Sequence, residues 1–144
     1  MPNCYQSRVI NAPINKVWVK INNFHDMSWT PNVVASCENV GEVNGNTVGA
    51  KRLLNGTIAE TLISIDANTK TFSYSIDEGP SPISSNDVSN YVGIVTLFEI
   101  TASNETFMVW KSSWESKSND NDAVEFCSTI YAQVMNDLQD TLTK

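Results

Sequence analysis

The sequence predicts an α+β fold in which a curved antiparallel sheet of about seven strands surrounds one long C-terminal helix. Three observations predict it. Short segments of alternating apolar and polar residues recur from residue 33 to residue 117, with turn-forming residues between them. A strand and short helical segments precede them. Beyond residue 118, the apolar spacing changes from two residues to three or four.

The first 32 residues predict one strand followed by two short helices. Alternation over residues 4–11 is typical of a strand. Pro13 then suits the first turn of a helix, and Ile14, Val17 and Ile21 recur at helical spacing. The second short helix is expected in HDMSWTPN, residues 25–32, as a turn or a single helical turn that Pro31 ends.

Six consecutive strands are expected next, with short connections that favour an antiparallel meander. A loop is expected at residues 78–87, EGPSPISSND, because this stretch holds two prolines and three serines. The six strands are predicted at residues 33–41, 48–54, 57–66, 69–77, 88–101 and 105–117.

The C-terminal residues, about 120–142, predict one long helix that packs on the concave face of the sheet. Asn119 or Asp120 can cap its first turn, where acidic side chains favour the helix dipole. Its apolar face is expected to comprise Val124, Cys127, Ile130, Tyr131, Val134, Leu138 and Leu142.

Composition limits the possible functions. A chain of 144 residues with 41% apolar residues suits a single globular domain, residues 1–144. The net charge is −7 and no basic block occurs, which argues against nucleic-acid and anionic-membrane partners. No apolar run approaches the roughly 18 residues of a membrane span.

The cysteine and histidine content bears on location and cofactors. Cys4, Cys37 and Cys127 are widely spaced and odd in number, which fits reduced thiols better than disulfides or a zinc site. The N-terminal residues lack a signal-peptide pattern, so a cytoplasmic location is expected. His25 is the only histidine, and we expect no metal and no cofactor.

Several stretches resemble the helix-grip superfamily of START-related and Bet v 1-like (SRPBCC) proteins, and especially its polyketide cyclase/dehydrase branch. They are INAPINKVWVKINNFHDMSWTP, GAKRLLNGTIAETLISID, FSYSIDEGPSPI, NYVGIVTL and VWKSSW. ETLISIDANTKTFSYSIDEGPSPI carries the branch's Glu, Leu, Asp, Tyr-x-Ile and Gly-Pro-x-Pro pattern. The resemblance implies the fold, but this fold hosts transport, sensing and catalysis alike. The loop after Pro82 is longer than in relatives, so the pocket mouth is expected to differ.

The hairpin KRLLNGTIAETL, residues 51–62, leaves two registers open around its Asn55-Gly56 turn. A loop of two or four residues would pair Arg52 with Ala59 and leave an exposed cross-strand ion pair. A loop of three residues would place Arg52 opposite Glu60 on the apolar face. The second register is favoured because it turns the apolar run inward, and because the resemblance implies an Arg and a Glu inside relatives.

A period of two assigns the inward face on other strands. One face carries Phe72, Tyr74 and Ile76, and another carries Met108, Trp110, Ser112 and Trp114. The resemblance favours Tyr91, Gly93, Val95 and Leu97 inward. Trp29 stands in a short loop before a proline, where core packing demands least. The residues expected to bind ligand are Trp29, Arg52, Glu60, Tyr74, Tyr91, Trp110, Trp114, Phe126 and Tyr131.

These features favour a protein, monomeric or homodimeric, that binds a small hydrophobic or aromatic molecule of polyketide, lipid or hormone type. Arg52 and Glu60 would anchor it. One alternative is a metal-free cyclase or dehydratase acting on a polyketide-like substrate, with Glu60 as base and Arg52 stabilising an enolate. Another is a non-enzymatic subunit that binds a partner protein and whose cavity is incidental.

Overall fold

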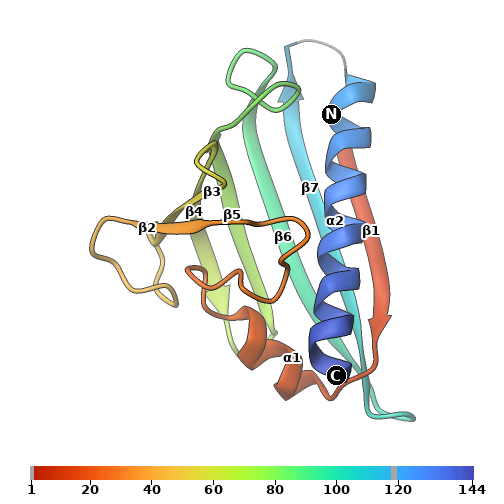
Figure 1. Cartoon of the computed structure of the whole chain (residues 1–144). Helices are drawn as coiled ribbons and strands as arrows, with labels where there is room; N and C mark the ends of the chain where they lie inside the picture. The colour runs from red at the N-terminus through yellow and green to blue at the C-terminus, as the bar shows by residue number, and fades with distance from the viewer. Residues whose placement is uncertain (1, 118–119) are drawn as a thin grey trace.

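The structure, a computed structural model, describes residues 2–117 and 120–144. These residues form one antiparallel sheet and two helices (Figure 1). The strands are β1 (Asn3–Ile10), β2 (Cys37–Val40), β3 (Lys51–Leu54), β4 (Ile58–Asp66), β5 (Thr71–Glu78), β6 (Val88–Ile100) and β7 (Glu105–Ser116), and the helices are α1 (Ile14–Ile21) and α2 (Asp120–Thr143).

The strand order in the sheet is β1-β7-β6-β5-β4-β3-β2. The strands from β2 to β7 therefore follow one another as the predicted meander, and β1 closes the sheet beside β7. The sheet curves around α2, which runs along its concave side (Figure 1). The predicted helix-grip fold is confirmed.

The prediction of two short helices after the first strand is wrong, because α1 is the only helix between β1 and β2 in this fully described stretch. A single helical bond, from the Val34 amide to the Thr30 carbonyl at 3.0 Å, marks the turn after Pro31. The turn does not continue into a helix, because the next amide along the chain, that of Ala35, is bound by a side chain. The Asn32 amide donates to Asp137, and the Ala35 amide donates to Asn55.

The same capture shortens β2, which was predicted at residues 33–41 and begins at Cys37. The amides of Ala35 and Ser36 donate to Oδ1 of Asn55 at 2.7 and 3.2 Å, so they are not free to pair with a neighbouring strand. Residues 30–36 thus form a connection that starts with this turn, and we call it the strap. It crosses the concave side of the sheet between α2 and the β3–β4 turn (Figure 1).

Helix α2 is tethered at one edge of the sheet. The Cys4 and Ser128 side chains of β1 and α2 are hydrogen-bonded at 3.2 Å, and Asn11 donates its amide to Gln139 at 2.8 Å. The face toward the sheet buries Ala123, Cys127, Tyr131, Val134, Met135, Leu138 and Leu142, whereas Val124 and Ile130 are only half-buried. Asp120 and Asp122 occupy the first turn, and the predicted Asn119 cap lies outside the described residues.

The predicted inward faces are buried except at Ile76, which is half-buried, and one of these faces depends on a glycine. Gly93 is the cross-strand partner of Tyr74, and a Cβ atom at this position would overlap the Tyr74 ring. The absence of a side chain at Gly93 therefore leaves room for the Tyr74 phenol ring. The Tyr74 ring consequently reaches the middle of the concave face, where it meets Trp110.

Candidate functional site

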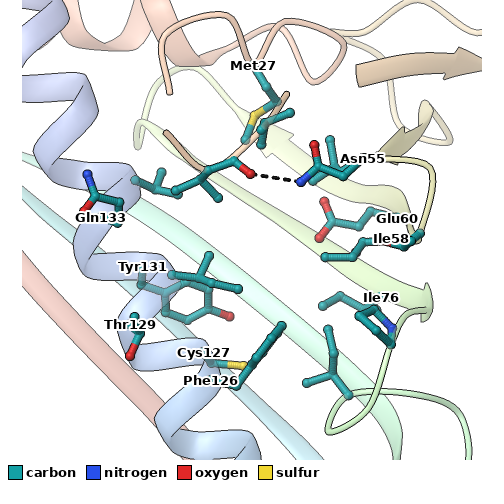
Figure 2. Close-up of a pocket in the computed structure, with 18 of the residues that line it drawn as sticks. Met27, Asn55, Ile58, Glu60, Ile76, Phe126, Cys127, Thr129, Tyr131 and Gln133 are labelled. Carbon is teal, nitrogen blue, oxygen red and sulfur yellow. Dashed lines mark hydrogen bonds between the residues drawn. The ribbon is translucent and has the colours of Figure 1, made fainter. Parts of the chain in front are cut away.

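A cavity of about 440 Å³ lies between the concave face of the sheet and α2 (Figure 2). Strands β3, β4 and β5 supply one wall and α2 supplies the other, while the strap and the loop after β5 border it. Most of the lining is apolar. Its apolar side chains include Val33, Val34, Leu54, Ile58, Ile76, Ile83, Phe126, Ile130 and Val134.

The hairpin between β3 and β4 brings two charged side chains to this wall. Leu54 pairs with Ile58, so the loop holds three residues, and Arg52 lies directly opposite Glu60. The turn residues Asn55 and Gly56 adopt positive φ of 54° and 69°, as an Asn-Gly pair readily does. The favoured inward register is confirmed, since Arg52 and Glu60 are only 3% and 5% exposed.

The guanidinium of Arg52 is held on several sides. Its Nε and Nη2 atoms both lie 2.7 Å from Oε1 of Glu60. Its Nη1 atom donates to the Phe24 carbonyl at 3.0 Å and to the Met27 sulfur at 3.3 Å. The guanidinium carbon also lies 3.7 Å from the centre of the Phe24 ring, a cation–π arrangement. These contacts offset part of the cost of burying the charge.

Glu60 uses only one of its two carboxylate oxygens in these contacts. No described residue donates a hydrogen bond to Oε2. The Glu60 carboxylate is directed into the cavity in Figure 2. Burial raises the pKa of Glu60 above its usual value, although neighbouring Arg52 acts in the opposite direction. The cavity wall therefore presents one unpartnered acceptor.

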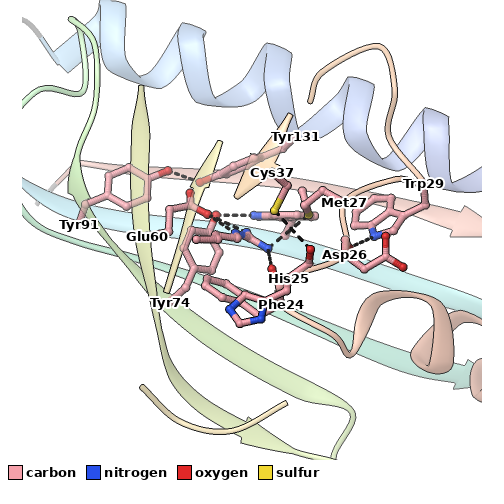
Figure 3. A network of polar contacts seen from close by, with 12 residues as sticks. Phe24, His25, Asp26, Met27, Trp29, Cys37, Glu60, Tyr74, Tyr91 and Tyr131 are labelled. Atoms are coloured by element: carbon pink, nitrogen blue, oxygen red, sulfur yellow. Dashed lines mark hydrogen bonds and ion pairs between the residues drawn. The ribbon is translucent and has the colours of Figure 1, made fainter. Parts of the chain in front are cut away.

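Buried hydroxyl groups line the side of the cavity formed by β6, β7 and α2. The Tyr91 hydroxyl donates to Ser112 at 3.1 Å, lies 3.2 Å from the Cys127 sulfur, and is hydrogen-bonded to the Tyr131 hydroxyl (Figure 3). Burial raises the pKa of both tyrosines well above the usual value and that of Cys127 to about 11. These groups are neutral at physiological pH.

A second polar contact joins Tyr74 to the same region. Trp110 donates its indole N–H to the Tyr74 hydroxyl at 2.9 Å. Burial, and next the charge of Glu60, raise the pKa of Tyr74. A neutral phenol therefore stands between the ion pair and the tyrosine cluster of Tyr91 and Tyr131.

Two residues that the sequence reasoning missed hold the strap over the cavity. Asp137 of α2 is 2% exposed and accepts hydrogen bonds from Thr30 Oγ1, from both Asn32 nitrogens and from Gln133. Burial alone would raise the pKa of Asp137, but these hydrogen bonds outweigh burial and lower it. A carboxylate among the apolar residues Val134, Met135 and Leu138 was the available signal.

The other end of the strap is fastened by Asn55 of the β3–β4 turn. Its Oδ1 atom accepts from the strap amides of Ala35 and Ser36. Its Nδ2 atom donates to the Val33 carbonyl at 2.9 Å (Figure 2). Asn55 therefore serves two purposes, because its positive φ forms the turn while its side chain substitutes for a neighbouring strand.

The structure brings seven of the nine predicted site residues together on the cavity wall: Arg52, Glu60, Tyr74, Tyr91, Trp110, Phe126 and Tyr131. It does not place Trp29 and Trp114 there. Trp29 is 2% exposed and donates its indole N–H to the Asp26 carbonyl at 3.0 Å, so it belongs to the core rather than to a free loop. Trp114 stacks on Tyr91 at 5.4 Å between ring centres and does not line the cavity.

An open acidic hollow adjoins the cavity and shares Phe126, Thr129 and Ile130 with it. Its remaining lining comprises Ser81 and Pro82 of the loop after β5, together with Asp87, Asp122 and Glu125. Within the described ranges, no cluster of His, Cys, Asp or Glu could hold a metal ion. No helix in the described chain is long and apolar enough to cross a membrane.

Comparison with known proteins identifies a family that matches nearly the whole chain. The family model described as "Polyketide cyclase / dehydrase and lipid transport" matches residues 1–143. No curated protein is significantly similar in sequence. A structurally similar protein from Nitrosospira multiformis is 45% identical, with a TM-score of 0.94 over 99% of this chain and 97% of that one.

More distant structures share the fold. The protein XoxI from Bacillus cereus is 24% identical, with a TM-score of 0.80 over 97% of this chain and 94% of that one. Major latex-like protein 151 from Panax ginseng is 16% identical, with a TM-score of 0.78 over 99% of this chain and 97% of that one. The helix-grip architecture and the match along nearly the whole chain lead to one conclusion: the chain belongs to the polyketide cyclase/dehydrase and lipid transport family.

Proposed function

We propose that this protein binds a small hydrophobic or aromatic molecule in the cavity between the sheet and α2. The observation that carries the proposal is a mainly apolar cavity of about 440 Å³ with a buried ion pair on its wall. Protein interiors are normally filled to crystal-like density. A cavity within the range of ligand pockets, roughly 300–1,000 Å³, therefore suggests that the space is reserved for an occupant.

Membership of a family named for polyketide cyclisation and lipid transport supports the same class of ligand. We infer that the protein works as a monomer or as a homodimer. Three free cysteines suit a reducing compartment, and we therefore place the protein in the cytoplasm.

The test is native mass spectrometry of freshly purified protein, followed by organic extraction and identification of any released molecule. We expect a bound mass that disappears on denaturation. Ile130→Trp fills the cavity from α2 and should abolish this bound mass. Val19→Trp adds the same ring at a position that is 71% exposed and should retain it. Protein without a bound mass, and with no heat of binding for any apolar probe, would refute the proposal.

A second candidate function is acid–base catalysis on a polyketide-like substrate, and one observation favours it. Glu60 has a raised pKa and a carboxylate oxygen that no described residue engages, close to the neutral phenol of Tyr74. Such a pair could remove and return a proton. If so, a polyketide-like substrate should be converted by wild-type protein and not by Glu60→Gln. Binding without conversion would contradict the catalytic function and support ligand binding.

A further inference from the structure

We propose that the ligand anchors through an uncharged hydrogen-bond donor, a hydroxyl or phenol group, which it donates to Oε2 of Glu60. This inference rests on the proposed binding function and specifies its ligand class. It also departs from the expectation that Arg52 would hold the polar end of the ligand, as a carboxylate anchor would require.

Arg52 has little capacity left for a ligand. A guanidinium carries five N–H groups. Two of them bind Glu60, and Nη1 donates to the Phe24 carbonyl and the Met27 sulfur. The Phe24 ring covers one face of the group at 3.7 Å. An incoming carboxylate would meet at most one remaining N–H and could not form the usual paired contact with arginine.

Glu60 has the opposite character. Its Oε1 atom accepts both bonds from Arg52, and its Oε2 atom accepts none from the described residues. The side chain is 6% exposed, so bulk solvent contributes little to satisfying it. Oε2 is not among the described side-chain atoms that are sealed from solvent without a partner, so its small exposed surface faces the cavity that Glu60 lines. A hydrogen bond to a charged group contributes about 1.5–3 kcal/mol. A ligand hydroxyl in the cavity would therefore gain a strong bond at this oxygen.

The charge balance favours a neutral donor. Arg52 and Glu60 already compensate one another, so a further cation or anion in this apolar space would be buried without a partner. The adjoining hollow carries Asp87, Asp122 and Glu125, and the chain as a whole has a net charge of −7. An anion approaching from this side would be repelled. The neutral phenols of Tyr74, Tyr91 and Tyr131 add no positive charge to the interior.

The experiment compares probes that share a naphthalene body and differ only in the attached group. They are naphthol, methoxynaphthalene, naphthoate, naphthylmethylamine and naphthalene itself, titrated calorimetrically at neutral pH. We expect naphthol to bind wild-type protein about tenfold or more tighter than methoxynaphthalene, as a hydrogen bond to a charged group predicts. Naphthoate and naphthylmethylamine should bind more weakly than naphthol.

Glu60→Gln should invert this preference. The glutamine carbonyl can keep the contact with Arg52, and its amide then presents a donor rather than an acceptor to the cavity. Naphthol should lose its advantage, and methoxynaphthalene, which only accepts, should bind relatively better. Glu38→Gln makes the same chemical change at an exposed position of β2 and should keep the wild-type ranking. A purely structural role of Glu60 would weaken all probes alike.

Each other outcome is also decisive. Equal affinities for naphthol and methoxynaphthalene, or tightest binding of naphthoate or naphthylmethylamine, would overturn the neutral-donor inference and leave the binding function standing. No binding of any probe, together with protein that carries no bound mass, would instead overturn the proposed function. If Glu60→Gln fails to fold, the wild-type ranking alone decides.

Discussion

Arg52 lies directly across the β3–β4 ladder from Glu60, and both of its bonds to that carboxylate end on the same oxygen. A buried ion pair in a closed core would gain stability from using both oxygens. Here, one oxygen is left toward a cavity that the chain does not fill. Oε2 therefore remains available to a hydrogen-bond donor in the cavity.

Changing either member of this pair alone should destabilise the fold more than changing both. Arg52→Met or Glu60→Gln should each lower the free energy of unfolding by about 3–5 kcal/mol, because each leaves an uncompensated buried group. The double variant Arg52→Met with Glu60→Gln removes both charges together and should cost much less. Urea unfolding of the two single variants and the double variant gives the coupling energy. A coupling energy of zero would contradict the buried pair.

Gly93→Ala should disturb the site through Tyr74. The added methyl group would overlap the phenol ring, so the fold should lose about 1–3 kcal/mol and the ring should shift. Probe binding should weaken because Tyr74 lines the cavity. In a Tyr74→Ala background, the same glycine change should cost little, as measured by thermal unfolding. An equal cost in both backgrounds would show that the ring is not the obstacle.

Asp137→Asn should loosen the strap and change the acid stability of the protein. An amide cannot accept all the hydrogen bonds from Thr30, Asn32 and Gln133, so a loss of about 1–3 kcal/mol is expected. The pKa of Asp137 is lowered in the folded state from 3.8. Its stabilisation is therefore present above this pH and is lost as the pH falls through the folded value.

The variant should accordingly lack that acid-dependent part of the stability. Urea melts at a series of acidic pH values measure the difference between the wild type and the variant. Asp140→Asn, on the exposed side of the same helix, is the matched control and should follow the wild-type curve. A variant curve parallel to the wild type throughout the acid range would contradict this role of Asp137.

Cys127 should resist alkylation in the folded protein. Burial raises its pKa to about 11, so very little thiolate exists near neutral pH. Cys37 is half-buried and should react with iodoacetamide before Cys4 and Cys127. Mass spectrometry of digested peptides gives the order, and in urea the three sites should react alike. Rapid labelling of Cys127 in the native state would show that the cavity side of α2 opens readily.

The inward ion pair could be predicted because hairpin registers are few, and only one of them placed Arg52 and Glu60 on the apolar face. Strand periodicity also identified the side on which Tyr74 and Trp110 lie. Periodicity does not indicate, however, which residues of that face reach the cavity. Trp114 shares the concave face but lies against Tyr91 instead of at the cavity.

The strap could not be predicted from local pattern. Its path depends on Asp137 and Asn55, which bind it from positions more than 100 and about 20 residues away in the chain. Val33 and Val34 favour a strand by propensity, yet distant side chains captured the nearby amides. The same contacts account for the missing second helix. Trp29 is held by other distant and local groups: its indole N–H donates to the Asp26 carbonyl, and its own carbonyl accepts a bond from Thr141 of α2.

The contacts that hold the strap also bear on the rate at which a ligand can leave the cavity. Between its end contacts at Asp137 and Asn55 the strap pairs with no strand, so we expect it to open more readily than the sheet. If ligands leave only when the strap opens, the rate of strap opening would limit the rate of ligand dissociation. Chemically different ligands would then share one maximum escape rate, and tighter contacts inside the cavity would lengthen residence only below that limit.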